Sequence, residues 1–114
     1  MKKIICFDLD NVLVDTKNSD YKNSKPLKKN IQIVNQLFSK GYYIKIFTAR
    51  YMGRYKENKE MVNKKKNLTI KFLKKNDIHY HELIMGKPSY DLFVDDKALF
   101  YKKNWSNYLK KKLL

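Results

Sequence analysis

Carboxylate, hydroxyl and ammonium side chains stand at the ends of short apolar runs in this chain. They are Asp8 and Asp10 after the first run, Thr48 after the second, Lys87 after the third, and Asp95 and Asp96 after the fourth. Paired carboxylates can attack a substrate and move protons, whereas a hydroxyl and an ammonium group can bind an anion. The types and order of these residues predict phosphoryl-transfer chemistry.

The apolar runs alternate with stretches of helical spacing, which is typical of parallel strands in an open α/β sheet. We expect strands over residues 2–8, 42–47, 81–86 and 91–94. In such a sheet the chemistry lies in the crevice at the carboxyl ends of the strands. The sequence therefore predicts an α/β fold, a Rossmann-like parallel sheet sandwiched by helices, which brings these side chains to one edge.

Capping residues and apolar spacing predict the helices. The first is expected to begin at Ser24-Lys25-Pro26, with Pro in its first turn, and to end before Gly41, which suits a left-handed C-cap. Its apolar face consists of residues at helical spacing: Leu27, Ile31, Val34, Leu37 and Phe38. A second helix is expected within 57–76, with a shorter one starting at Asn67. The tail after Lys97 is expected to hold one or two amphipathic helices.

These residues resemble the four motifs of the haloacid-dehalogenase-like superfamily, the phosphohydrolases with an aspartate nucleophile. Asp8-Leu9-Asp10-Asn11-Val12-Leu13 resembles the first motif, Thr48 the second, Lys87 the third and Asp95-Asp96 the fourth. The resemblance covers the whole chain. The stretches 43–50 and 85–91 also look like the short bacterial members linked to capsule and surface-polysaccharide biosynthesis. The resemblance implies a superfamily core with no cap domain.

The resemblance also implies a role for each site residue. Asp8 would attack phosphorus and form an aspartyl-phosphate, while Asp10 would protonate the leaving oxygen and then activate water. Thr48 and Lys87 would hold the transferring phosphoryl group. A phosphate dianion repels a carboxylate, so a divalent cation is needed as well. The implied Mg²⁺ ligands are Asp8, the backbone carbonyl of Asp10, Asp95 and, directly or through water, Asp96.

Asp10 and the short connections bear on the subclass. Family dehalogenases lack an acid/base at the position of Asp10, which favours a phosphatase. Residues 11–41 and 49–81 leave no room for a cap domain, so we expect an open site and either a larger substrate or a homo-oligomer. Asn11 stands where many relatives have Gly, and we expect it to alter loop geometry rather than chemistry.

Arg50 and Arg54 lie on a polar and aromatic loop after Thr48, at the expected rim of the site. They could bind a sugar hydroxyl, a carboxylate or a second phosphate of the substrate. The alternative is a solvated loop with no binding role. His79 and His81 alternate before a strand, but no Cys or third His stands nearby, which favours strand-edge packing over a metal site.

Composition indicates one globular domain, residues 1–114, that does not enter a membrane. Hydrophobic residues make up 43% of the chain, and no apolar run is long enough to span a bilayer. Asp8 and Asp10 interrupt the run after Met1, unlike a signal peptide, and we expect a cytoplasmic protein with Cys6 in its core. The net charge of +15 comes almost wholly from Lys spread over every helix. This spread favours a solvated surface over a nucleic-acid-binding stripe.

The sequence therefore predicts a Mg²⁺-dependent phosphomonoesterase that acts on a phosphorylated sugar or polyol. The link to capsule or surface-polysaccharide biosynthesis rests on the resemblance alone. Two alternatives stay open. One is a phosphatase for the 3′ or 5′ ends of nucleic acids, which fits an open site and a positive charge. The other is a non-catalytic module that binds phosphate or nucleic acid, against which the intact Asp8 and Asp10 argue.

Overall fold

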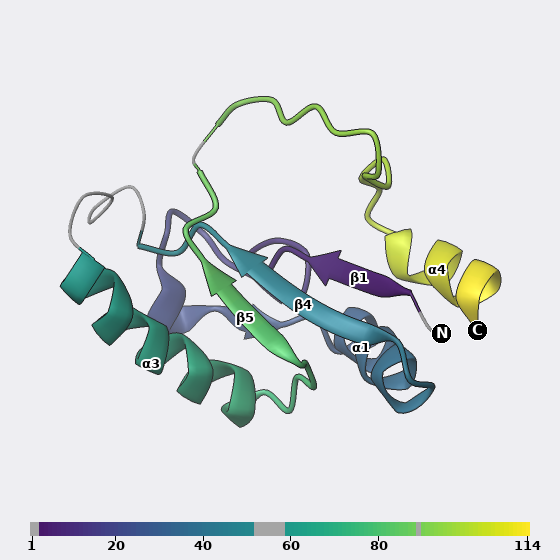
Figure 1. The fold of residues 1–114 in the computed structure, drawn as a ribbon, viewed down its shortest axis with the longest axis horizontal. Coiled ribbons are helices and arrows are strands. Elements are labelled where there is room, and N and C mark those ends of the chain that lie inside the picture. The colour runs from purple at the N-terminus through teal and green to yellow at the C-terminus, as the bar shows by residue number, and fades with distance from the viewer. Residues whose placement is uncertain (1–2, 52–58, 89) are drawn as a thin grey trace.

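The computed structural model describes residues 3–51, 59–88 and 90–114. Its centre is a parallel sheet of three strands in the order β1 (Ile4–Phe7), β4 (Tyr43–Thr48) and β5 (Glu82–Met85) (Figure 1). Since all three strands run in the same direction, their carboxyl ends meet at one edge. The predicted parallel α/β sheet is confirmed, and its edge carries the residues that follow each strand.

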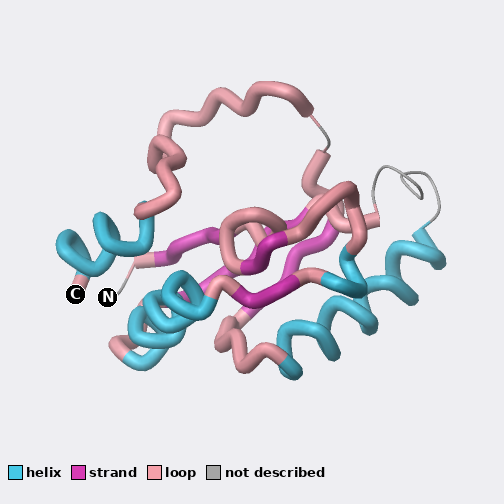
Figure 2. Tube along the Cα trace, turned by 180° about the vertical axis from the view of Figure 1, so that it is seen from behind, coloured by secondary structure: helices cyan, strands magenta, loops and turns pink. Residues whose placement is uncertain are grey.

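In the described part of the chain, three α-helices flank the sheet. Helix α1 (Lys28–Ser39) packs against one face and lies in front of the strands in Figure 2. Helix α3 (Lys59–Lys75) runs beside β5, and α4 (Trp105–Leu113) lies next to the start of β1 (Figure 1). Because α3 is one continuous helix through Asn67, the prediction of a second helix starting there is wrong.

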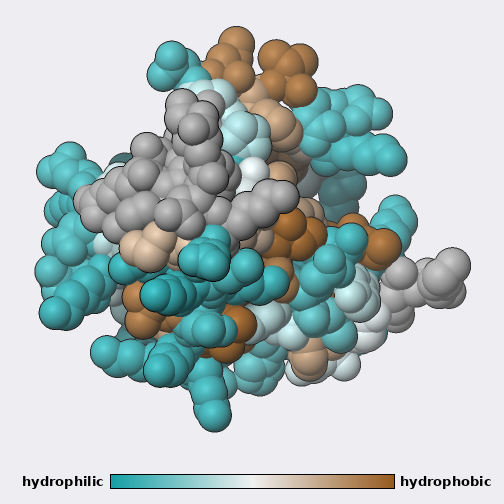
Figure 3. Space-filling view, turned by 60° about the vertical axis from the view of Figure 1, so that its left-hand side comes forward, coloured by the Kyte–Doolittle hydropathy of each residue, from teal (hydrophilic) through white to brown (hydrophobic). Residues whose placement is uncertain are grey.

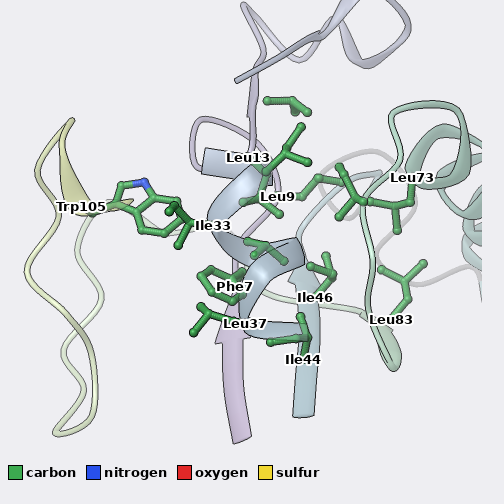
Figure 4. Close-up of a cluster of buried hydrophobic side chains, with 14 residues drawn as sticks. Phe7, Leu9, Leu13, Ile33, Leu37, Ile44, Ile46, Leu73, Leu83 and Trp105 are labelled. Atoms are coloured by element: carbon green, nitrogen blue, oxygen red, sulfur yellow. The ribbon is translucent and has the colours of Figure 1, made fainter. Parts of the chain in front are cut away.

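The hydrophobic core lies between the sheet and α1 (Figure 4). After the exposed Tyr43, strand β4 alternates buried and partly buried residues, and Ile44 and Ile46 are fully buried. They meet Leu37 of α1, which sits on the apolar face predicted from helical spacing. Trp105 closes one end of the core with its ring centroid 5.6 Å from that of Phe7. Burying these side chains is the main force that holds α1 and α4 to the sheet.

A small hairpin precedes α1. Strands β2 (Val14–Asp15) and β3 (Lys25–Pro26) pair in antiparallel fashion, and the 3-10 helix η1 (Tyr21–Asn23) lies between them. Pro26 therefore belongs to a strand, and the prediction that it occupies the first turn of the helix is wrong. Pro lacks a backbone N–H and is therefore confined to edge strands. Both strands of a two-stranded ribbon are edge strands, so Pro fits there.

Gly41 lies in the connection from α1 to β4 and has φ 94°. This left-handed conformation is open to glycine, as the predicted C-cap requires. At the opposite end of the sheet from the carboxyl edge, His81 stacks between Phe38 and Tyr43, with ring centroids 4.4 and 4.6 Å away. The Nδ1 atom of His81 accepts a hydrogen bond from the backbone N–H of Ile44. The predicted strand-edge packing thus describes His81, whereas His79 is exposed and its Nε2 lies 3.0 Å from Asp77 Oδ1.

Residues 90–104 form no strand, and the prediction of a strand over 91–94 is wrong. This segment arches over the top of the molecule in Figure 1, and hydrophobic side chains show at the top in Figure 3. Leu92 and Val94 are 81% and 86% exposed. Cys6 on neighbouring β1 is exposed as well, so its predicted place in the core is also wrong.

In the part of the chain that the structure describes, we find no helix with the length and apolarity needed to cross a membrane.

Candidate active site

Asp8 and Lys87 meet at the carboxyl edge of the sheet. Asp8 follows the last residue of β1, and Lys87 lies just beyond β5. Lys87 Nζ donates to Asp8 Oδ2 at 3.0 Å, while Asp8 Oδ1 accepts from the N–H of Leu9 at 2.8 Å. The carboxylate of Asp8 is about one third exposed, so a substrate can reach it. The sheet thus holds a carboxylate beside a fixed cation where an anion can enter.

The backbone around Gly86 explains how Lys87 reaches this position. Gly86 has φ 98°, a conformation that L side chains rarely adopt, and the chain turns there as β5 ends. The N–H of Lys87 then donates to the carbonyl of Thr48 at 3.1 Å, which ties the turn to the end of β4. Lys87 is therefore fixed through its backbone as well as through its contact with Asp8.

Two opposing effects set the charge state of Lys87. Its partial burial would lower its pKa, but hydrogen bonds with Tyr90 and Asp8 outweigh burial, so the pKa of Lys87 is raised above the ordinary value of 10.5. Lys87 is therefore a full cation at neutral pH. Such a cation can balance the charge of a phosphoryl group.

Thr48 is the last residue of β4 and is fully buried. Its hydroxyl oxygen accepts a hydrogen bond from the N–H of Arg50 at 3.0 Å. The carbonyl of Thr48 binds the N–H of Lys87. Thr48 thus lies with Lys87 at the predicted edge, and its hydroxyl helps to shape the loop that follows β4.

Asp10 pairs with Arg50, a contact that the sequence did not predict. Arg50 Nε donates to both carboxylate oxygens of Asp10 at 3.1 and 3.0 Å, and Nη2 donates to Oδ1 at 2.8 Å. The side chain of Arg50 is only 2% exposed, although the sequence placed it on the rim. The guanidinium lies between the rings of Tyr21 and Phe72, 4.8 and 4.4 Å from their centroids.

The hairpin before α1 completes this partly buried network. Thr16 Oγ1 donates to Asp10 Oδ1 at 2.5 Å and lies 2.7 Å from Ser24 Oγ, which accepts from Arg50 at 3.1 Å. Asn11 takes φ 63°, which Asn adopts more readily than most residues, and its side chain accepts from the N–H of Thr16. Asn11 thus supplies the turn after β1 that a glycine could also supply.

Sequence reasoning missed Thr16 and Ser24 as members of the site. They carry no motif and stand in a polar stretch that resembles an ordinary loop. The available signal was indirect, because a polar segment directly after the paired aspartates has to pass the carboxyl edge of the sheet. Hydroxyl groups there are well suited to hold a carboxylate.

Asp95 and Asp96 lie apart from the other acidic residues. They are exposed on the irregular segment after β5, and Asp95 Oδ1 accepts only from the N–H of nearby Lys97, at 3.3 Å, among the hydrogen bonds of the described chain. No three acidic, His or Cys side chains of the described residues are grouped to hold a metal ion. Within the described residues, the side chains of Asp95 and Asp96 are therefore not grouped with those of Asp8 and Asp10, and the Mg²⁺ site stays a prediction. Arg54, the second predicted substrate-binding arginine, lies outside the described residues.

Comparisons with known structures show what this fold resembles. The chain matches a crystal structure of a structural-genomics target from Vibrio cholerae with 29% identity and a TM-score of 0.77, covering 98% of both chains. A D,D-heptose 1,7-bisphosphate phosphatase from B. bronchiseptica, solved with magnesium and phosphate, matches with 15% identity and a TM-score of 0.52. The match covers all of this chain and 65% of that one.

A third structure, the Pnkp1/Rnl/Hen1 RNA repair complex, matches with 21% identity and a TM-score of 0.52. The match covers 99% of this chain but 32% of the matched chain, so the present chain spans about a third of that protein. No protein-family model matches the sequence, and neither does a curated protein. The likeness to these structures shows the fold, a parallel α/β sheet flanked by helices, with no cap domain in the part of the chain that the structure describes.

Proposed function

We propose that this protein is a phosphomonoesterase that uses Asp8 as its nucleophile. The observation that carries the proposal is the contact of Asp8 with the cation of Lys87, at the shared carboxyl edge of a parallel sheet. The likeness to a phosphatase solved with phosphate supports the same reaction class. In the sequence, the order of the four motifs adds support that does not depend on this geometry.

In the first step, a carboxylate oxygen of Asp8 attacks phosphorus and the bond from phosphorus to the leaving oxygen breaks. Asp10 gives its proton to that leaving oxygen, so an alcohol departs and an aspartyl-phosphate remains. In the second step, water attacks the same phosphorus and gives a proton to Asp10. The bond from phosphorus to Asp8 breaks, inorganic phosphate leaves and both carboxyl groups return to their starting states.

Lys87 and Thr48 serve the phosphoryl group in this proposal. Charge grows on the equatorial oxygens in the transition state, and a fixed ammonium group stabilises them without having to reorient. Lys87 already lies beside Asp8, and Thr48 is joined to the backbone of Lys87. Thr48 is proposed to donate its hydroxyl hydrogen to a phosphoryl oxygen, since its oxygen already accepts from Arg50.

Mg²⁺ is part of the proposal on two grounds. The four motifs resemble those of a metal-dependent superfamily, and one structural neighbour was solved with magnesium. When bound, Mg²⁺ would neutralise charge on the phosphoryl group. Among the described residues no three acidic, His or Cys side chains are grouped, and the two steps above are written for what Asp8 and Asp10 do toward substrate and water.

The proposed substrate is a phosphorylated sugar or polyol of capsule or surface-polysaccharide biosynthesis. The resemblance of stretches 43–50 and 85–91 supports this class, as does the likeness to a heptose bisphosphate phosphatase. A phosphatase for nucleic-acid ends is the second candidate, favoured by the net charge of +15 and the likeness to part of an RNA repair complex. The site is proposed to work in the cytoplasm, either alone or in a homo-oligomer.

The test is phosphate release from a panel of sugar phosphates, polyol phosphates, nucleotides and oligonucleotides phosphorylated at either end. Wild type is assayed with Mg²⁺ and with EDTA, beside Asp8→Asn. We expect metal-dependent release from a sugar or polyol phosphate and none from the variant. Preference for oligonucleotides at physiological salt would favour the second candidate, and release that survives Asp8→Asn would contradict the mechanism.

A further inference from the structure

Arg50 is the most fully buried charged residue of the described chain. The hydrogen-bond partners of its side chain are side chains of the protein itself. Its side chain is 2% exposed, and its recorded hydrogen bonds go to Asp10 and Ser24. Two aromatic rings, of Tyr21 and Phe72, cover the guanidinium. A guanidinium fixed in this way cannot swing to the rim to hold a sugar or a second phosphate without breaking all of these contacts.

The contact with Arg50 fixes the side-chain orientation of Asp10, which strand β1 does not. Strand β1 ends at Phe7, and Asp10 lies in the turn beyond it, where the backbone leaves the side chain a choice of rotamers. Arg50 donates to both oxygens of its carboxylate, and Thr16 donates to Oδ1. The forked geometry of a guanidinium fixes the plane of the carboxylate, which a single ammonium donor cannot do.

An acid/base group must sit within hydrogen-bonding reach of the proton that it moves, and a misplacement of about 1 Å can lower a rate about 100-fold. We infer that Arg50 is a positioning residue that acts through Asp10, holding the carboxyl group where it serves the leaving oxygen. This inference rests on the proposed phosphatase activity. It replaces the substrate-binding role that the sequence suggested for Arg50.

The leaving group of the substrate distinguishes positioning of Asp10 by Arg50 from a purely structural role and from phosphate binding. An alkoxide, as from glycerol phosphate, needs a proton when it leaves, whereas p-nitrophenolate from p-nitrophenyl phosphate does not. The ratio kcat/KM reports the first step, in which the leaving group departs. A residue that acts through the acid therefore affects glycerol phosphate far more than p-nitrophenyl phosphate.

The experiment measures kcat/KM on both substrates for wild type, Arg50→Met, Arg50→Lys and Asp10→Asn. We expect Arg50→Met to lose about 100-fold on glycerol phosphate and less than about tenfold on p-nitrophenyl phosphate. Arg50→Lys should fall between wild type and Arg50→Met, because Lys keeps the charge but not the fork. In the Asp10→Asn background, Arg50→Met should have no further effect, since the group that it positions is gone.

Removal of a buried cation can prevent folding, so a milder variant is included. Thr16→Val deletes one donor to Asp10 and keeps the side-chain shape, and we expect a loss of about tenfold confined to glycerol phosphate. Thr69→Val is the matched control. Thr69 is buried as well, 1% exposed against 8% for Thr16, but its hydroxyl donates to the carbonyl of Lys65 within α3, so the ratio between the two substrates should stay unchanged.

Three outcomes would overturn the inference. If Arg50→Lys and Thr16→Val each lowered kcat/KM equally on both substrates, the role of Arg50 would be purely structural. A rise in KM on both substrates with kcat unchanged would indicate phosphate binding by Arg50. Additive losses in the double variant would show that Arg50 does not act through Asp10. Wild type that releases phosphate from no substrate of the panel described above would instead contradict the proposed function itself.

Discussion

At the scale of single residues, each aspartate of the first motif is paired with a different cation. Asp8 binds Lys87 from beyond β5, and Asp10 binds Arg50 from beyond β4. The sequence predicted the edge at which these residues meet, because their places at the ends of apolar runs define it. It could not predict the pairing, since a Lys and an Arg are equally plausible partners until the burial of each is known.

Lys87 is expected to stabilise the phosphoryl group, so Lys87→Met should lower kcat by about 100- to 1,000-fold. The matched control is Lys45→Met. Lys45 also pairs with a carboxylate, Glu82 at 3.8 Å, but it lies within β4 and not at the carboxyl edge. Steady-state kinetics on both variants checks the prediction, and equal losses would remove Lys87 from the mechanism.

The raised pKa of Lys87 predicts how the Asp8 contact depends on pH. A cation whose pKa is higher in the folded state stabilises that state fully below its unfolded value, here the ordinary 10.5, and loses this contribution as pH rises through the folded value. The difference in unfolding free energy between wild type and Lys87→Met should therefore be constant from neutral pH to about 10.5 and shrink above it. Denaturant titrations at a series of pH values measure it. A difference that shrinks already below about pH 9 would contradict a raised pKa for Lys87.

Asp95 is exposed, and its proposed role as a Mg²⁺ ligand can be tested directly. If it binds the proposed Mg²⁺, Asp95→Asn should raise the Mg²⁺ concentration for half-maximal activity by about tenfold or more. Asp91→Asn is the matched control on the same segment and should leave that concentration unchanged. Calorimetric titration of Mg²⁺ gives a readout independent of turnover. The same titration curve for wild type and Asp95→Asn would exclude Asp95 as a ligand.

At the scale of elements, the sequence was sufficient where one physical signal dominated. Apolar runs predicted β1, β4 and β5, and helical spacing predicted α1. It failed where two signals competed. Pro26 suits both a helix start and a two-stranded ribbon, and pairing with Val14 decided for the ribbon. The apolar run 91–94 has strand composition, but composition does not state which strand edge it would join.

The exposure of Val94 gives a direct test of that segment. Val94 is 86% exposed and Val34 is fully buried in α1, so the same substitution can be compared at both sites. Val94→Ala should change the unfolding free energy by less than about 0.5 kcal/mol, whereas Val34→Ala should lower it by about 2 kcal/mol. Denaturant unfolding of both variants measures the difference. A loss at Val94 as large as that at Val34 would favour the strand that the sequence predicted.

At the scale of the whole molecule, the net charge of +15 is carried on a surface where hydrophilic side chains are widely spread (Figure 3). Such a surface attracts polyanions through long-range forces that salt screens. Salt should affect binding of the two candidate substrates differently, because an oligonucleotide contacts many lysines and a sugar phosphate contacts few.

Binding of a single-stranded oligonucleotide should therefore weaken by about tenfold or more between about 50 and 200 mM salt. KM for a sugar or polyol phosphate should change by less than about threefold over the same range. Fluorescence anisotropy and steady-state kinetics measure the two quantities. Oligonucleotide binding that resists salt would indicate specific contacts and would favour the nucleic-acid-end phosphatase.

The central claim is that Asp8 carries the phosphoryl group during turnover. The most direct measurement is to trap the phosphorylated protein by rapid acid quench, reduce it with borohydride and map its peptides by mass spectrometry. Reduction of an aspartyl-phosphate leaves homoserine, and the account predicts homoserine at position 8, dependent on substrate and absent from Asp8→Asn. Turnover with a modified residue at any other position, or with none, would contradict it.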